Sequence, residues 1–250
     1  MRLRRRDGLH AALCLALAIC ACCLTRGSAQ ESGLRSSRVV VDSEGWRLVG
    51  DLLLPASQQP VAAVLLFNQA DGDRTVYAEL ARALAGRGIA SLRLDLRGHG
   101  ESTNLGRFVP GEVTRDPLIW DAESDVHAAH EYLQVNPRIA ADRIGILGAS
   151  YSGEEMAEAG RLHGYAQAYV ALSPGSFSDA SVSGIDASGV PWLFVTSRDD
   201  RFLVAITASV QQQSETAELL FIPGKAHASD LLVSFPDMAE RIATWLAHRL

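Results

Sequence analysis

The sequence predicts an α/β protein in which a mostly parallel β-sheet is covered by helices on both faces. Short apolar segments alternate with helix-like segments along most of the chain, as in repeated β-α-β units. One segment, residues 61–67, is a continuous apolar run, which is typical of a strand buried on both faces. A length of 250 residues with 48% hydrophobic and 21% charged residues allows one domain with a full core.

The sheet is expected to begin with an antiparallel hairpin of residues 38–42 and 46–54, turned at residues 43–45. Residues 61–67 then start the parallel part. In parallel sheets of this kind, the ligand site lies at the carboxyl ends of the strands. In chain order we expect a helix over 77–87, a strand over 89–95, a helix over 120–134, a strand over 143–147, a helix over 152–162, strands over 168–172 and 192–196, a helix over 202–213, a strand over 219–222 and a helix over 235–250.

The first 29 residues have the pattern of an export signal. A basic segment at residues 2–6 precedes an apolar run at residues 9–24, and a polar stretch follows. Gly27-Ser28-Ala29 supplies the small residues that signal peptidase prefers, which predicts cleavage after Ala29. The apolar run is marginal in length for a transmembrane span.

Two other interpretations of this leader remain open. Residues 19–22, Ile-Cys-Ala-Cys, resemble a bacterial lipobox with Cys22 as the acylated residue, although Cys20 departs from the usual pattern. In the second of these interpretations, the leader is an N-terminal anchor that is not cleaved. In each case we expect an exported protein that is periplasmic, secreted or tethered to the membrane through its N-terminus. Residues 30–37 are then a short linker, and residues 38–250 a single domain.

Charge and cysteine placement narrow the class of protein further. The formal net charge is −6, and residues 30–250 hold 18 basic against 28 acidic residues. Such an acidic domain argues against binding to nucleic acid, which needs a basic face. All four cysteines lie in the leader, so the domain after it has no disulfide, no cysteine nucleophile and no cysteine-based zinc site.

A nucleophile motif follows the strand predicted at residues 143–147. Gly148, Ser150 and Ser152 have the spacing of Gly-x-Ser-x-Gly, with serine in place of the second glycine. A strand-to-helix turn that exposes a serine is sharp and strained, and only small residues fit two positions before and after it. Because a predicted strand precedes the motif and a predicted helix follows it, Ser150 is a candidate catalytic nucleophile.

These segments resemble the α/β-hydrolase family, over most of residues 45–250. Residues 65–70, Leu-Leu-Phe-Asn-Gln-Ala, are similar to a strand that ends in His-Gly-x or His-Gln-Ala, with Asn68 in place of the histidine. Residues 93–102 are similar to the turn after the family's next strand, and residues 141–151 resemble the dienelactone-hydrolase-like and acyl-peptidase-like branches. The resemblance implies the α/β-hydrolase fold with a serine nucleophile.

The resemblance also implies the other members of a catalytic triad, in the chain order serine, acid, histidine. Residues 197–200, Ser-Arg-Asp-Asp, are similar to the family's Gly-x-x-Asp, which favours Asp200 as the acid, with Asp199 as the alternative. His227 follows a predicted strand where the family places its histidine. A neutral serine is a poor nucleophile, so His227 would accept its proton and Asp200 would orient the imidazole.

The negative oxygen of a tetrahedral intermediate needs hydrogen-bond donors. The family pattern implies the backbone N–H groups of Ala70 and Tyr151 as this oxyanion hole. Residues 173–190, where many members insert a helical lid, are short and rich in Ser, Gly and Asp. This predicts an open site with minimal cover that accepts small substrates.

We therefore expect an exported serine hydrolase, of carboxylesterase type, that cleaves small esters, acyl-amides or thioesters through an acyl-enzyme on Ser150. The chain contains no nucleotide-binding motif. His127 and His130 lie three residues apart, without an evident third ligand, and are expected on a solvated helix face. We accordingly expect no cofactor, no metal, and a small-molecule ester as the partner. The alternatives are a non-catalytic binding protein with this fold and a small serine peptidase.

Overall fold

The computed structural model describes residues 33–111 and 116–250. The predicted leader, its cleavage site after Ala29 and the lipid-attachment candidate Cys22 lie outside the described residues. In the described part of the chain, no helix combines the length and the apolar character that crossing a membrane requires.

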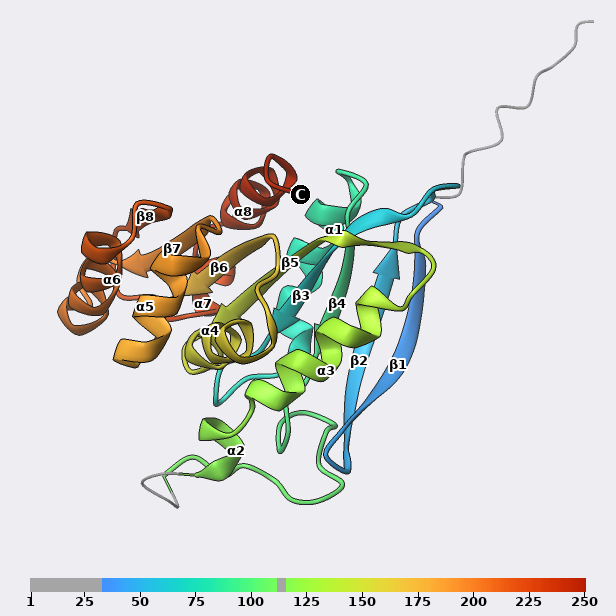
Figure 1. Ribbon diagram of the computed structural model, residues 1–250, viewed down its shortest axis with the longest axis horizontal. Coiled ribbons are helices and arrows are strands. Elements are labelled where there is room, and N and C mark those ends of the chain that lie inside the picture. Colours follow the sequence, from blue (N-terminus) through green and yellow to red (C-terminus); the bar gives the residue numbers. More distant parts are fainter. Residues whose placement is uncertain (1–32, 112–115) are drawn as a thin grey trace, which may run out of the picture. The chain divides into compact units, whose positions relative to one another are not determined.

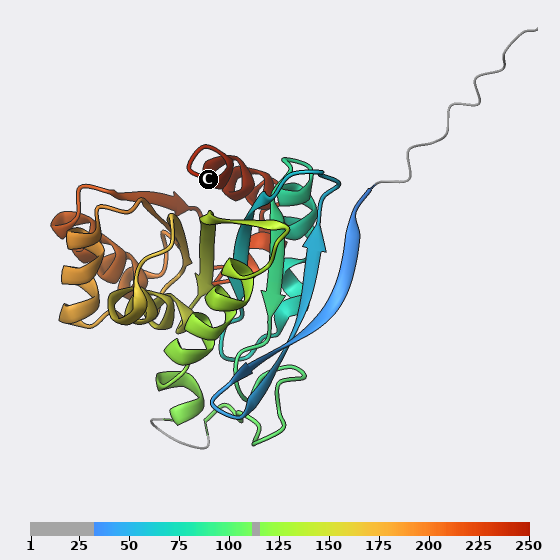
Figure 2. The ribbon, with the colours of Figure 1, turned by 45° about the vertical axis from the view of Figure 1, so that its right-hand side comes forward.

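An eight-stranded sheet forms the centre of the fold, in the order β1-β2-β4-β3-β5-β6-β7-β8 (Figure 1). β2 is antiparallel to both β1 and β4, and every other pair of neighbours is parallel. Figure 2 shows the blue β1–β2 pair at one edge of the sheet. The strands are β1 Arg35–Ser43, β2 Trp46–Leu54, β3 Val61–Phe67, β4 Ala90–Leu94, β5 Ile139–Ala149, β6 Ala168–Leu172, β7 Trp192–Ser197 and β8 Ala217–Ile222.

Helices cover both faces of this sheet. Buried side chains of α1, α7 and α8 pack with one face, and those of α3, α4, α5 and α6 pack with the other. Figure 1 shows α3 and α4 in front of the strands and α1 behind them. The helices are the 3-10 helix η1 Arg74–Tyr77 and the α-helices α1 Ala78–Ala85, α2 Pro117–Trp120, α3 Glu123–Gln134, α4 Ser152–His163, α5 Asp179–Ser188, α6 Arg201–Gln213, α7 Asp230–Ser234 and α8 Met238–Ala247.

The apolar run at residues 61–67 is the doubly buried strand that the sequence predicts. Ala63, Leu65 and Phe67 enter the core on one face, whereas Val64 and Leu66 enter the core on the other. All five are fully buried. Because successive side chains of a strand point to opposite faces, a strand that serves two cores must be apolar at every position.

Several elements differ from the sequence-based expectation. β1 begins at Arg35, inside the stretch expected as a linker, because pairing with β2 continues to Leu54. The helix expected over 120–134 is two helices, since Asp121 has a non-helical backbone. The helix expected over 77–87 is the shorter α1, which follows η1 at Tyr77. The helix expected over 235–250 is the shorter α8, and the sequence did not predict α7, which lies before that range.

The segment expected to give minimal cover contains a ten-residue helix, α5. Its composition favours turns, but both of its ends are capped. The Ser178 side chain accepts a hydrogen bond from the Ser181 N–H at the start, and Gly189 ends the helix in the left-handed conformation. Val182 and Ile185 are buried against the core. Tertiary packing and caps therefore overrode weak helix propensity.

Candidate active site

The turn that carries Ser150 connects β5 to α4, at the edge of the sheet where the parallel strands have their carboxyl ends. Ser150 has a φ of 57°, in the left-handed region that side-chain-bearing residues rarely adopt. Its N–H donates to the Leu172 carbonyl oxygen at 2.9 Å, which ties the turn to β6. A Cβ at Gly148 would lie 2.6 Å from the Ser152 carbonyl oxygen, so this position requires glycine. The strained geometry is that of a nucleophile turn.

Serine at position 152 strengthens this turn instead of disturbing it. The Ser152 hydroxyl is fully buried. It accepts a hydrogen bond from the Ala149 N–H at 2.7 Å, and lies 3.0 Å from the Ala149 carbonyl oxygen, to which it can donate. The small side chain thus bonds to the peptide groups just before Ser150, a link that glycine could not supply.

His227 meets Ser150 across the site. Its Nε2 atom lies 3.2 Å from the Ser150 Oγ atom, within reach of a hydrogen bond. The imidazole is half-buried and follows β8, as the sequence predicts. The next residue, Ala228, is fully buried and has a φ of 51°. The histidine loop, residues 223–229, is therefore also held in a strained turn.

The structure places both acid candidates after β7 but joins neither to the histidine. Asp200 is half-buried, and its Oδ1 atom accepts a hydrogen bond from the Leu203 N–H at 3.1 Å, which caps α6. Asp199 is exposed. Among the described residues, no hydrogen bond or ion pair links His227 to either carboxylate. The acid of the triad therefore stays a prediction.

The two expected oxyanion donors lie at the ends of neighbouring strands. Ala70 is in the turn after β3, and Tyr151 immediately precedes α4. Across residues 33–111 and 116–250, neither backbone N–H donates to another protein atom. Unpaired N–H groups beside a nucleophile are what an oxyanion hole requires. The Tyr151 ring stacks on His99, with 5.6 Å between centroids, and burial raises the pKa of its phenol.

Asn68, which replaces the family's histidine, has a structural contact. Its side-chain oxygen accepts from the Leu96 N–H at 3.0 Å, and its amide donates to the Gln69 carbonyl oxygen at 2.9 Å. The side chain is fully buried. Asn68 thus holds the turn after β3 against the turn after β4, so its contacts serve loop packing.

Gln69 is a further residue of the site that sequence reasoning did not single out. Its Oε1 atom accepts from both the N–H and the hydroxyl of Ser229, at 2.9 and 2.8 Å, and its amide donates to Asp71 at 2.7 Å. The side chain is 7% exposed. Gln69 therefore joins the turn that holds Ala70 to the loop that holds His227. Its place directly before the oxyanion donor is the signal that could have identified it.

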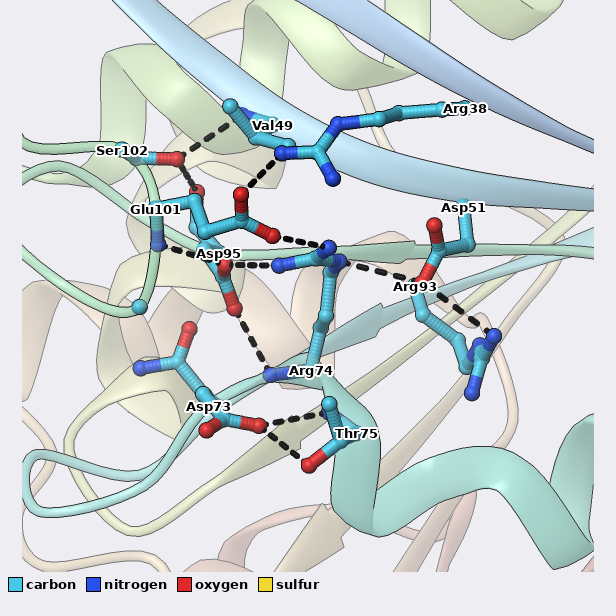
Figure 3. A network of polar contacts seen from close by, with 12 residues as sticks. Arg38, Val49, Asp51, Asp73, Arg74, Thr75, Arg93, Asp95, Glu101 and Ser102 are labelled. Atoms are coloured by element: carbon cyan, nitrogen blue, oxygen red, sulfur yellow. Dashed lines mark hydrogen bonds and ion pairs between the residues drawn. The ribbon is translucent and has the colours of Figure 1, made fainter.

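A buried arginine network holds the turn after β4 (Figure 3). The Arg74 guanidinium contacts Asp51, Asp95 and Glu101 at 3.1, 2.5 and 2.7 Å. Asp95, fully buried, also accepts from the N–H groups of Arg74 and Glu101. Hydrogen bonds from Arg38 and Arg74 lower the pKa of Glu101 to about 2. Arg74 and Glu101 of this network, together with Ala70, line a polar hollow of about 480 Å³.

Glu155 is a buried carboxyl group in the helix that follows the nucleophile. It lies in the first turn of α4, and its Oε2 atom accepts from the Ala122 N–H at 3.0 Å, at the start of α3. Burial raises the pKa of Glu155 to about 8, although the hydrogen bond to Ala122 opposes this shift. The group therefore links two helices mainly in its neutral form at pH 7.

The sheet topology and the strained serine turn define the chain as an α/β hydrolase by fold. Residues 44–176, more than half of the chain, match the family model described as X-Pro dipeptidyl-peptidase (S15 family). The chain belongs to this family of α/β hydrolases. The matched residues include Ser150 and end before Asp200 and His227.

Related sequences extend the match without naming an activity. Two proteins of Mycobacterium tuberculosis, one from each of two strains and both described as uncharacterized, are 33% identical to this chain over 155 residues. The alignment covers 62% of this chain and 50% of each relative. The chain therefore spans about half the length of the curated relatives it matches.

Solved structures with the same fold include several hydrolases. The 2,6-dihydroxy-pseudo-oxynicotine hydrolase has a TM-score of 0.69 at 16% identity, covering 86% of this chain and 68% of that one. Dienelactone hydrolase from Anabaena variabilis has a TM-score of 0.65 at 20% identity, covering 87% and 97%. Est1E from Butyrivibrio proteoclasticus, bound to ferulic acid, has a TM-score of 0.66 at 17% identity, covering 84% and 96%. These similarities show the shared fold and confirm the resemblance.

Proposed function

We propose that the protein is a serine hydrolase that cleaves small esters, acyl-amides or thioesters through an acyl-enzyme on Ser150. The observation that carries this proposal is the 3.2 Å separation of Ser150 Oγ and His227 Nε2, with the serine in a strained strand-to-helix turn. A serine in that conformation is held at the site surface with a base within reach, which is what nucleophilic catalysis needs.

The reaction follows from this pair. His227 Nε2 takes the hydroxyl proton of Ser150 as Oγ attacks the carbonyl carbon, and the carbonyl oxygen becomes negatively charged. The N–H groups of Ala70 and Tyr151 stabilise that oxygen. His227 then gives its proton to the leaving oxygen, nitrogen or sulfur, whose bond to carbon breaks and leaves the acyl group on Ser150. A water molecule repeats the sequence and releases the acid.

Asp200 completes the proposal as the group that orients the imidazole. Its register after β7 supports this role, which requires the carboxylate to turn from the Leu203 N–H toward His227 Nδ1. The acid is the member of the triad that the geometry supports least directly, so its variants carry the sharpest test of the arrangement.

The setting of the reaction belongs to the same proposal. The basic and apolar leader supports export, with cleavage after Ala29 or acylation of Cys22 as the two forms of the mature protein. The acidic charge after the leader supports a small-molecule substrate over nucleic acid. The proposed steps use side chains and backbone of this chain without a cofactor.

A second candidate function is peptide cleavage. The family match to an X-Pro dipeptidyl-peptidase model favours it specifically, and the same serine and histidine could perform acyl transfer from an amide. Peptidase and esterase activity differ in the leaving group, so a substrate panel separates them.

The test uses purified protein with p-nitrophenyl acetate, an X-Pro p-nitroanilide and a fluorophosphonate probe. We expect ester turnover and labelling of one site, on the peptide that contains Ser150. Ser150→Ala should abolish both, whereas Ser36→Ala, at an exposed position on β1, should change neither. Preferred cleavage of the anilide would instead support the peptidase. Folded protein that neither labels nor cleaves would support a non-catalytic binding protein.

A further inference from the structure

An apolar groove lies between α5 and α6, on the far side of the nucleophile from the arginine network. Its volume is about 460 Å³, within the range of small-molecule sites. Phe177, Val182, Ile206 and Val210 line it, and Phe202 lies at its rim with 69% of its surface exposed. Ser176, Asp179, Ser209 and Gln213 also line it. The apolar side chains of the groove can remove an apolar group from water.

The groove is continuous with the candidate active site at Gly175. A Cβ at Gly175 would lie 3.9 Å from the Ser150 Oγ atom, so this end of the groove is in contact distance of the nucleophile. The Gly175 N–H also donates to the Ser150 carbonyl oxygen at 3.4 Å. A group attached to the carbon that Ser150 attacks can therefore enter the groove directly.

The chemistry of the groove contrasts with that of the polar hollow beside Ala70. Asp179 is the one residue with a formal charge among those that line the groove, whereas the polar hollow is lined by five such residues. A charged substituent would lose its hydration in the groove with little in return. The groove therefore favours an uncharged aliphatic or aromatic group.

We infer that this groove binds the acyl group of the substrate, and that the enzyme prefers esters of longer aliphatic acids or of aromatic acids over acetate esters. The inference rests on the proposed function. The leaving group must receive its proton from His227, and none of the residues that line the groove belongs to the histidine loop, residues 223–229. The acyl side, which stays on Ser150, is thus the side that faces α5 and α6.

The experiment measures kcat/KM for p-nitrophenyl esters of acids of increasing chain length and of benzoic acid. Each methylene that the groove buries should raise kcat/KM by at most about fourfold, until the groove is filled. Ala205→Trp places a large ring in the groove from an exposed position on α6. It should remove the gain with chain length, so that longer esters lose more kcat/KM than acetate does, whereas Ala247→Trp, at an exposed position on α8, should leave the whole series unchanged.

Three outcomes overturn the inference. A kcat/KM that does not rise with acyl length shows that the groove is not used. Loss of acetate and longer-chain turnover by the same factor in Ala205→Trp leaves the gain with chain length intact, which shows that the groove does not select the acyl group. A second series uses acetate esters of alcohols of increasing length. If Ala205→Trp lowers kcat/KM for the longer alcohols and not for the longer acids, the groove binds the leaving group instead. Absence of Ser150-dependent turnover with every ester would refute the proposed function itself, which the acetate measurement with Ser150→Ala identifies separately.

Discussion

Ser150 and Asp200 each follow a parallel strand, but the chain holds the two residues in different ways. The serine turn, residues 148–153, has a strained backbone at Ser150, which is held by a glycine that nothing else can replace and by a buried hydroxyl bonded to the peptide beside it. In the acid loop, residues 197–203, the N–H groups of Arg198 and Asp199 bond to Ile222 and Gly224, so its backbone follows the end of β8.

The side chains of the acid loop are less constrained than its backbone. The Asp200 carboxylate caps a helix, and Asp199 faces solvent. The difference shows that main-chain bonding fixes where a catalytic loop lies, while the choice among adjacent side chains depends on weaker contacts. The conformation of the serine turn is thus set by local geometry. In the acid loop, the Asp200 carboxylate can either cap α6 or orient His227, and these two roles compete.

The largest expected effect comes from the serine turn. Ser150→Ala and His227→Ala should each lower kcat by about 10⁶, because the two groups act as one unit. For the same reason, the double variant should be no slower than either single variant. Turnover of p-nitrophenyl acetate, with active-site titration of the wild type, measures these values. Additive losses in the double variant would mean that the two residues act independently.

The acid loop gives the next largest effect. Asp200→Asn should lower kcat by up to about 10⁴, because the imidazole would lose the carboxylate that sets its tautomer. Asp199→Asn is the matched control and should stay within about threefold of the wild type, since the Asp199 side chain is exposed. If Asp199→Asn is the more damaging change, the register of the acid loop is one residue earlier than proposed.

The next prediction concerns Glu155, a buried acid in the helix after the serine turn, and the pH dependence of the free energy of unfolding. Its pKa is about 8 in the folded protein against 4.5 in the unfolded chain, so the unfolded state loses its proton first as the pH rises. Stability from this group is therefore full below about pH 4.5 and is lost progressively up to about pH 8.

The measurement is the free energy of unfolding by denaturant at several pH values. Wild type should lose stability on the order of a few kcal/mol between the two pKa values, and Glu155→Gln should flatten that slope. Glu215→Gln, at an exposed position after α6, should keep the wild-type slope. An unchanged slope in Glu155→Gln would show that this carboxyl is ionised in the folded protein.

The smallest expected effect concerns Gln69, which links the turn that holds Ala70 to the histidine loop. Gln69→Ala leaves the Ser229 donors unpaired and frees the histidine loop, which should lower kcat by about 10-fold to 100-fold with little change in KM. Gln69→Glu keeps an acceptor for Ser229 and should recover part of the loss. Equal damage from both variants would show that the amide contact with Asp71, and not the bond to Ser229, is what matters.

The sequence was informative wherever a local constraint determines the residue type. The apolar run of β3 and the small residues around Ser150 each reflect such a constraint, and the structure has both. α5 was missed because its caps and buried residues stabilise a helix that its composition disfavours. Gln69 was missed because its partner, Ser229, lies 160 residues further along the chain. Contacts of that range leave no periodic signal in one sequence.

The aromatic stack beneath the groove gives the molecule a built-in optical reporter. Trp192 is fully buried and stacks on Tyr169, with 4.2 Å between ring centroids and 5° between planes. Phe177, which lines the groove, meets the Trp192 ring edge-on at 6.4 Å. A ligand that moves Phe177 would change the surroundings of this indole. Trp192 is one of four tryptophans in the chain, and its contribution to the fluorescence and near-ultraviolet circular dichroism can follow occupancy of the groove without any turnover.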